Sequence, residues 1–354
     1  MKFINVILVT LLLHLSGSMS VAQDSRLHFY GYFDVEIEGS NKDAAGKRWT
    51  FDQHHFNVVT IYRLDDRFRV FGEIEWEHGV QHEAGGSNSS GLIALERAWL
   101  EFKYSDAFKV KVGKFLPPFG IYNLKHDASP TFLSTFLPNS IYGKHNNTLG
   151  KKQRLFAKFA TGVQVLGTLF ANQWQGEYYL YLSNGRGPDP GSKDNNSNKA
   201  VGGRFVVSPP VEQLRFGLSF YTDKNGDANN TEQTTLAFDA ALNYSNVQIE
   251  AEFFLPKLEK VDTTGTPNGT FQTGIGYYVQ GAYTFIDKLT PFARYDFFDP
   301  DDDTTDDGET DIVLGINFSV NPKVYLKSEI HFLSFQNPNT KSYELFVSAI
   351  TVAF

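Results

Sequence analysis

The chain has 354 residues, no cysteine, 15% aromatic residues and a formal net charge of −8. The acidic balance argues against a nucleic-acid partner, because phosphate binding needs a basic surface. The absence of cysteine excludes disulfides and thiolate metal sites. Length alone allows either two domains or one large barrel.

Residues 1–22 have the pattern of a secretory signal peptide. Lys2 supplies the positive start, Phe3–Leu15 is an apolar run too short to span a bilayer, and Ser20-Val21-Ala22 offers small residues for cleavage. We expect cleavage near Ala22, with an uncleaved anchor as the alternative. No later stretch approaches the roughly 20 apolar residues of a transmembrane helix. The mature chain, 23–354, is therefore expected to be exported as a soluble protein or a β-barrel.

Apolar and polar residues alternate from Arg26 to the end of the chain. Near the start, for example, Phe33 and Val35 share one face of the expected strand, while Asp34 and Glu36 share the other. This period predicts about sixteen strands, at 26–38, 50–64, 67–80, 92–104, 107–115, 161–171, 174–184, 199–207, 212–223, 231–244, 247–258, 269–285, 289–299, 309–320, 323–336 and 342–354.

The connections between these strands alternate in length. Tight links such as Asp65-Asp66 and Asn172-Gln173 alternate with long polar connections such as 39–49 and 185–198. Short turns on one rim and long loops on the other are typical of an outer-membrane barrel, whereas a β-sandwich does not sort its loops in this way. We therefore expect an all-β, transmembrane antiparallel β-barrel in a Gram-negative outer membrane, in contact with its lipids and lipopolysaccharide. Such a sheet must close on itself, because lipid cannot bond its backbone.

The alternation stops at residues 116–154. Prolines at 117, 118, 130 and 138 exclude a strand there, and the many apolar residues exclude disorder. Gly113 lets another backbone approach closely, and Gly120 permits a bend of the chain. We expect a packed loop whose apolar residues, at 132–142, dock on the inner wall of the barrel.

The sequence also carries two family resemblances. The final strand ends on Phe354, which resembles the sorting signal that outer-membrane barrels present to their assembly machinery. Residues 110–120, VKVGKFLPPFG, resemble the VG(K/R)F-x-PFG signature of porins related to the phosphate-selective porins O and P. The signature covers 107–124, whereas the resemblance in architecture covers 24–354.

The resemblance implies a water-filled porin, commonly a homotrimer, whose third long loop folds inward and narrows the channel. It implies passive diffusion of small hydrophilic solutes or ions, anions such as phosphate among them, with no cofactor and no catalytic residue. The phosphate-selective relatives cluster lysine and arginine in the channel. Acidic residues are plentiful here, so the preference for anions or cations stays open.

A barrel of this size is too wide to be filled by side chains, so its polar face should line water. The charged residues predicted to line the pore are Lys109, Lys111, Arg215, Asp239, Glu250, Glu252, Arg294, Asp296, Lys327 and Glu329. Those predicted to face water from the constriction loop, 116–154, are Lys125, His126, Asp127, Lys144, His145 and Lys151. Facing charges set ion preference in pores, but each of these side chains alone could simply wet the lumen.

Two other functions remain open. A non-conducting barrel could serve adhesion or envelope structure. An outer-membrane hydrolase would need a nucleophile beside a base, for which Ser87, Ser89, His78 and His331 are available, but no G-x-S-x-G elbow occurs.

The sequence predicts no resident metal. His54 and His55 are neighbours on a predicted strand, so they should point to opposite faces and cannot chelate one ion. The acidic run Asp299–Asp311 does not match the spacing of a helix–loop–helix calcium site. We expect a solvated outer loop there, with bridging to lipopolysaccharide through divalent cations as an open alternative.

Overall fold

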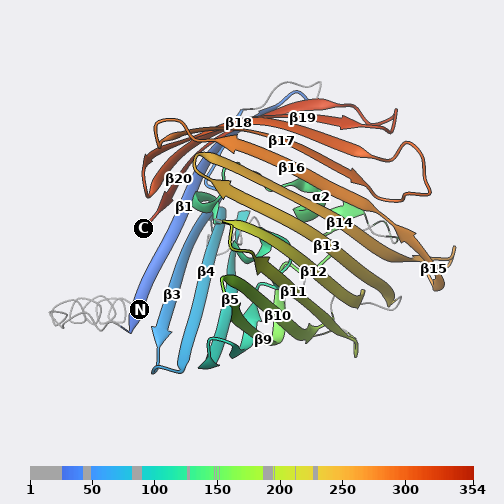
Figure 1. Cartoon of the computed structure of the whole chain (residues 1–354). Helices are drawn as coiled ribbons and strands as arrows, with labels where there is room; N and C mark the ends of the chain where they lie inside the picture. Colours follow the sequence, from blue (N-terminus) through green and yellow to red (C-terminus); the bar gives the residue numbers. More distant parts are fainter. Residues whose placement is uncertain are drawn as a thin grey trace, which may run out of the picture.

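The computed structural model describes residues 26–42, 49–81, 90–125, 128–146, 148, 150, 152–185, 194, 196–211, 213–225 and 230–354. The predicted signal peptide and three predicted loop residues, His126, Asp127 and Lys151, lie outside this part of the chain. The described residues form one antiparallel sheet rolled into a barrel (Figure 1). No helix among them is long and apolar enough to cross a membrane.

The strands of the sheet are β1 (Leu27–Ser40), β2 (Thr50–Asp52), β3 (His55–Arg63), β4 (Phe68–Gln81), β5 (Ser90–Ser105), β6 (Phe108–Phe115), β9 (Ala160–Ala171), β10 (Trp174–Asn184), β11 (Lys199–Ser208), β12 (Leu214–Asn225), β13 (Thr231–Tyr244), β14 (Val247–Val261), β15 (Pro267–Thr273), β16 (Ile275–Tyr283), β17 (Leu289–Asp299), β18 (Glu309–Asn321), β19 (Val324–Phe335) and β20 (Tyr343–Ala353). Because β2 with β3, and β15 with β16, each form one interrupted strand, the described residues make a sixteen-stranded barrel. The expected fold class is confirmed.

Pairing of the first strand with the last closes the barrel. β1 pairs with β20 from Tyr32 opposite Ala353 to Ser40 opposite Leu345. At the end of this seam, Gly31 and Phe354 exchange backbone hydrogen bonds of 2.9 Å in both directions. The sheet therefore has no free edge along this seam, as a bilayer requires.

Side chains alternate between the inside and the outside of the barrel. On β13, Thr235, Ala237 and Asp239 are buried, whereas Leu236 and Phe238 between them are exposed. A soluble protein rarely exposes so continuous an apolar surface. The outer face is thus built to meet lipid, and the inner face carries the polar residues.

The two rims differ in the way that the sequence predicts. Tight turns connect β9 to β10, β13 to β14 and β16 to β17, and they contain residues with positive φ, among them Asn172, Ser245 and Asp287. Longer segments connect the strands at the opposite rim. The longest of the described connections, 116–159, carries the short elements η1 (Asn123–Lys125), η2 (Ser129–Thr131), α2 (Asn139–Tyr142), β7 (His145–Asn146) and β8 (Lys152–Gln153).

A charge on the outer face should destabilise the barrel in proportion to its depth in the bilayer. Leu236→Arg, in the middle of β13, is expected to lower the free energy of unfolding by about 2–4 kcal/mol. Glu232→Arg, on the same face near the rim, should cost about 0–1 kcal/mol. Urea unfolding of the two variants in lipid vesicles tests this, and equal losses would contradict a membrane-spanning strand.

Candidate functional site

Residues 116–159, called here the inner loop, turn into the lumen immediately after β6, as Figure 1 shows for the green segments inside the barrel. Gly113 has a φ of +131°, and an added Cβ would lie 2.3 Å from the carbonyl oxygen of Ala98. Gly120 has a φ of +59°, and its Cβ would lie 2.1 Å from the hydroxyl of Tyr142. Glycine is thus required at both positions for the chain to turn and pack.

An aromatic cluster holds the inner loop against the wall. Phe119 stacks on Phe156 with ring centroids 4.1 Å apart, and both rings contact Phe254 of β14 edge-on. The other aromatic residues of this buried cluster are Phe115, Tyr122, Phe132, Tyr142, Tyr181, Tyr221, Tyr278 and Phe298. Side chains from strands β10 to β14 and from β16 and β17 belong to this cluster and thus meet the loop. Buried aromatic pairs of this kind stabilise beyond their buried area.

Carboxylates on the wall bind the backbone N–H groups of the inner loop. Glu329 on β19 accepts hydrogen bonds from the amides of Thr135 and Phe136 at 3.0 Å, and Asp296 on β17 accepts the amides of Asn139 at 2.6 Å and Ser140 at 3.2 Å.

Glu252 on β14 completes the set of carboxylates. It accepts the amide of Ile121 at 3.1 Å and the hydroxyls of Tyr142 at 2.8 Å and Tyr278 at 2.7 Å. Burial, followed by the charge of Glu252, raises the pKa of Tyr142 well above its ordinary value, so this phenol stays a neutral donor.

Two cations on the wall bind the carbonyl groups of the same loop. Arg294 donates to the carbonyl of Phe136 at 3.0 Å and to the hydroxyl of Ser134 at 3.1 Å. Lys327 donates to the carbonyls of Ser129 at 2.5 Å and Ser134 at 3.0 Å. Polar backbone removed from water needs such partners, and bonds to charged groups are the strongest available.

These contacts divide the residues predicted to line the pore into those covered by protein and those that remain accessible. Five of them, Glu252, Arg294, Asp296, Lys327 and Glu329, point inward but are at most 2% exposed, because the inner loop covers them. Asp239 is 8% exposed and forms a two-bond ion pair with Arg204, at 2.5 and 2.8 Å. For the five side chains under the inner loop, contact with bulk water is replaced by contact with protein, whereas Asp239 still lines a small cavity of about 100 Å³ together with Arg215.

The other four predicted pore residues remain accessible. Arg215 and Glu250 line a cavity of about 490 Å³ between the inner loop and the tight-turn rim. Lys109 lines a second cavity of about 640 Å³ beside the turns of β3–β4 and β5–β6. Lys111, two residues further along β6, lies 4.6 Å above the ring of Trp99.

The charged residues of the inner loop that the structure describes also differ in their exposure to water. Lys144 is exposed, and Lys125 is half-buried, with its ammonium 4.9 Å from the ring of Tyr122. Burial lowers the pKa of Lys125, against the opposing charge of Glu250. His145 is buried: its ring stacks on Phe298 at 3.7 Å, and Nε2 lies 2.8 Å from the carbonyl of Asn139. The expectation that His145 faces water is therefore wrong, because the hairpin β7–β8 turns it against β17.

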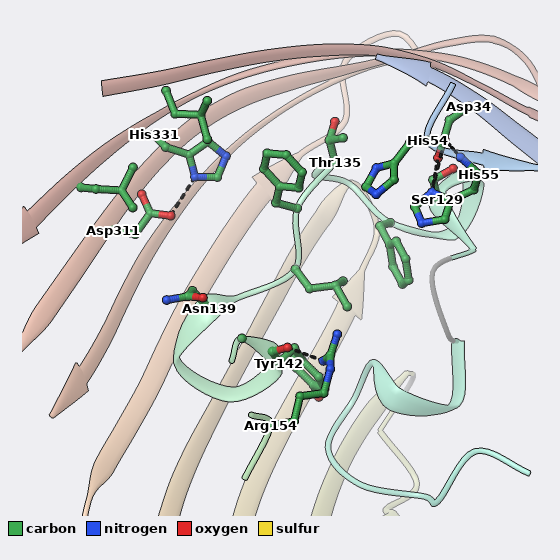
Figure 2. A pocket seen from close by; sticks show the side chains of 16 residues that line it. Asp34, His54, His55, Ser129, Thr135, Asn139, Tyr142, Arg154, Asp311 and His331 are labelled. Atoms are coloured by element: carbon green, nitrogen blue, oxygen red, sulfur yellow. Dashed lines mark hydrogen bonds and ion pairs between the residues drawn. The ribbon is translucent and has the colours of Figure 1, made fainter. Parts of the chain in front are cut away.

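A cavity of about 370 Å³ lies between the inner loop and the opposite wall (Figure 2). The loop contributes Thr135, Asn139 and Tyr142 to its lining, and β18 and β19 contribute Asp311 and His331, whose facing atoms are 2.7 Å apart. On the side of β1 and β3 the cavity is lined by three further residues, Asp34, His54 and His55. The inner loop thus narrows the lumen at this level without filling it.

The predicted arrangement of His54 and His55 is wrong. The pairing of β1 runs from Phe33 opposite Phe56 to Glu36 opposite Asp52, so the second strand holds one extra residue between these pairs. This bulge cancels the alternation. Both imidazoles line the same cavity and stack with ring centroids 3.9 Å apart.

The two histidines of the hydrolase alternative also bond to carboxylates. His78 Nδ1 lies 2.7 Å from Asp52, and His331 lies 2.7 Å from Asp311 and 3.2 Å from Glu329. Ser87 and Ser89 fall outside the described residues. In the outer loop of the predicted acidic run, Asp301 pairs with Lys260 at 3.1 Å.

Several residues of the site carry no distinct local signal in the sequence. Arg204 and the Arg97–Glu73 ion pair of the β4–β5 wall look like ordinary lumen charges on their strands. The aromatic residues Tyr221, Tyr278 and Phe298 are different, because they occupy positions of the inward face where a wet lumen would favour polar side chains. Large aromatic rings at inward positions were thus the feature of the sequence from which a docked loop could have been predicted.

The comparisons with known proteins decide the family. A family model described as Gram-negative porin matches residues 9–338. The chain belongs to the Gram-negative porin family. A search of the curated proteins found no match. Family membership places this porin in the outer membrane, and its narrower resemblance to the phosphate-selective porins O and P is not confirmed by these matches.

Solved structures agree on the fold. The porin is similar to an anion-selective porin from Comamonas acidovorans, with a TM-score of 0.65, 14% identity, and coverage of 93% of this chain and 99% of that one. It is similar to Salmonella typhi OmpF in complex with daunomycin, with a TM-score of 0.63, 14% identity and coverage of 93% and 97%. It is also similar to a trimer form of OmpT, an outer membrane protein of Vibrio cholerae, with a TM-score of 0.61, 13% identity and coverage of 93% and 99%.

Crowding at Gly120 predicts that a methyl group there undocks the inner loop. Gly120→Ala should weaken docking by roughly 1–3 kcal/mol, because the methyl group meets Tyr142 and Glu252. Trypsin should then cleave faster after Lys125 and Lys144 while the barrel stays folded. Gly150→Ala is the matched control, since Gly150 also has a positive φ, +71°, but no atom within 4 Å of an added Cβ. Equal cleavage of the two variants would contradict this role of Gly120.

Proposed function

We propose that this porin is a passive diffusion channel for small hydrophilic solutes. The observation that carries the proposal is the docking of the inner loop on the wall, which leaves cavities of about 370 and 490 Å³ beside it. The loop is held by bonds to charged side chains, so the size limit is a property of the folded protein. No step of such transport needs a cofactor or a catalytic group, and hydrolysis has no part in the proposal.

We further propose a preference for anions. The buried carboxylates Glu252, Asp296 and Glu329 already accept hydrogen bonds from the inner loop, which reduces their effect on the lumen. The cavity of about 640 Å³ beside the turns of β3–β4 and β5–β6 is lined by six cations and three carboxylates. The cations are Arg26, Arg63, Arg67, Arg69, Lys103 and Lys109, and the carboxylates are Asp65, Asp66 and Glu101. Rings of basic side chains favour anions, phosphate included. The similarity to an anion-selective porin is consistent with this preference.

The assembly of the porin is also a proposal. A homotrimer is consistent with the trimer form of the similar Vibrio cholerae protein. We propose cleavage near Ala22, recognition of the strand that ends on Phe354 by the barrel-assembly machinery, and contact of the outer loops with lipopolysaccharide. The exposed ring of Phe354 fits such recognition, since it remains accessible at the closing seam. Light scattering and N-terminal sequencing of the extracted protein measure the oligomeric state and the cleavage site.

Deletion of the middle of the inner loop should widen the channel. Deletion of residues 125–145 is expected to raise single-channel conductance in planar bilayers by roughly twofold or more, because the wide lumen loses its constriction. Deletion of residues 263–265, in the outer turn between β14 and β15, should leave the conductance unchanged. A wild-type barrel that inserts but carries no current would contradict the channel and favour an adhesive or structural role.

Reversal of charge on β6 should weaken the preference for anions. The wild-type reversal potential in a potassium chloride gradient should show that chloride is favoured. The double variant Lys109→Glu/Lys111→Glu should shift the permeability ratio toward potassium by about twofold or more. Lys323→Glu makes the same replacement once, on an exposed rim residue, and should have little effect. A cation preference of the wild type would contradict the proposal.

A further inference from the structure

The cavity beside the inner loop contains a group of ligand atoms to which the channel function assigns no role. The bulge between β2 and β3 turns His54 and His55 toward Asp34 on β1 (Figure 2). His55 Nδ1 lies 3.1 and 3.3 Å from the two oxygens of Asp34. His54 Nδ1 lies 3.3 Å from Glu36, two residues further along the same strand.

These distances suit a transition-metal ion. One ligand atom from each of Asp34, His54 and His55 can be chosen so that all lie within 4.8 Å of one another. Around tetrahedral zinc, with bonds of about 2.0–2.1 Å, neighbouring ligand atoms are about 3.3 Å apart. Two imidazole nitrogens and one carboxylate are a ligand set that zinc and similar divalent ions accept. Glu36, whose carboxylate lies 3.3 Å from His54 Nδ1, is not part of this group.

The groups around the ligands hold them in position. The side-chain amide of Gln53 donates to the carbonyl of Asp34 at 2.8 Å and to that of His55 at 3.0 Å, which ties the two ligand-bearing segments together. The amide of His55 donates to the carboxylate of Asp34 at 2.8 Å. Bonds of this kind fix ligand orientation in metal sites.

The site is also accessible from the lumen. Asp34 is fully buried and His55 is 7% exposed, but the side chain of His54 is 24% exposed, and all three line the cavity of about 370 Å³. A hydrated ion inside the channel can therefore reach the ligands without unfolding of the wall.

We propose that Asp34, His54 and His55 form a binding site for one divalent transition-metal ion, such as Zn²⁺, inside the channel beside the inner loop. An ion bound there places positive charge at the narrowed level of the lumen and occupies part of it. The inference about current rests on the proposed channel function, whereas the inference about binding does not. The alternative is that the histidines form only ion pairs and stacked rings.

Calorimetric titration of the untagged porin in detergent with zinc chloride tests the site. The wild type should bind one zinc ion per chain. His54→Ala, His55→Ala and Asp34→Asn should each weaken binding by at least about tenfold. His28→Ala is the matched control, because His28 lies on the same face of β1 about 20 Å away and should bind zinc as the wild type does.

A second probe keeps the test valid if an alanine variant does not fold. The heat-dependent shift of the barrel on gels identifies folded variants, and His54→Gln and His55→Gln replace any that fail. Copper(II) bound to the wild type should show an electron paramagnetic resonance spectrum with two nitrogen ligands, and with one in each glutamine variant. Absence of zinc binding in the wild type, or binding unchanged in either histidine variant, would overturn the site.

Single-channel recording separates this inference from the proposed function. Current without zinc tests the channel alone, and calorimetry tests the metal alone. Micromolar zinc should lower the wild-type current and leave that of His55→Gln unchanged. Zinc that binds but does not alter the current would overturn the effect on transport.

Discussion

The barrel depends on the requirement that every backbone N–H and C=O within the lipid be paired inside the sheet. Pairing of β1 with β20 meets this requirement, and it produces a ring of sixteen strands in the described chain. A ring of that size leaves a lumen that side chains alone do not fill. The inner loop is the consequence, since it supplies the material that narrows this space.

Entry of a loop into the barrel creates a second requirement of the same kind. Its own amides and carbonyls leave bulk water, and they need partners on the wall. Glu252, Asp296 and Glu329 accept the amides, while Arg294 and Lys327 bind the carbonyls. Inward-facing charge therefore has a structural use in this porin, and charge that is used in this way has less influence on passing ions.

The histidine pair shows how much one inserted residue changes. In a regular strand, neighbouring side chains point to opposite faces. The extra residue between the pairs Phe33–Phe56 and Glu36–Asp52 places two imidazoles and a carboxylate together in the lumen. The bulge lies at the level of the inner loop, so this small irregularity concentrates ligand atoms where the channel is narrow.

Alternation along the chain was enough to predict the strands, several of them to the residue, as at Trp174–Asn184 and Leu289–Asp299. Where the alternation stops, at 116–154, prolines and apolar residues predicted a packed loop, because together they exclude both a strand and disorder. Strand period and turn chemistry are local properties, and local properties can be read from one sequence. Tertiary structure alone decided which inward charges meet water and which bind the loop. That outcome depends on where the loop docks, through contacts such as that between Tyr142 and Glu252, 110 positions apart in the chain.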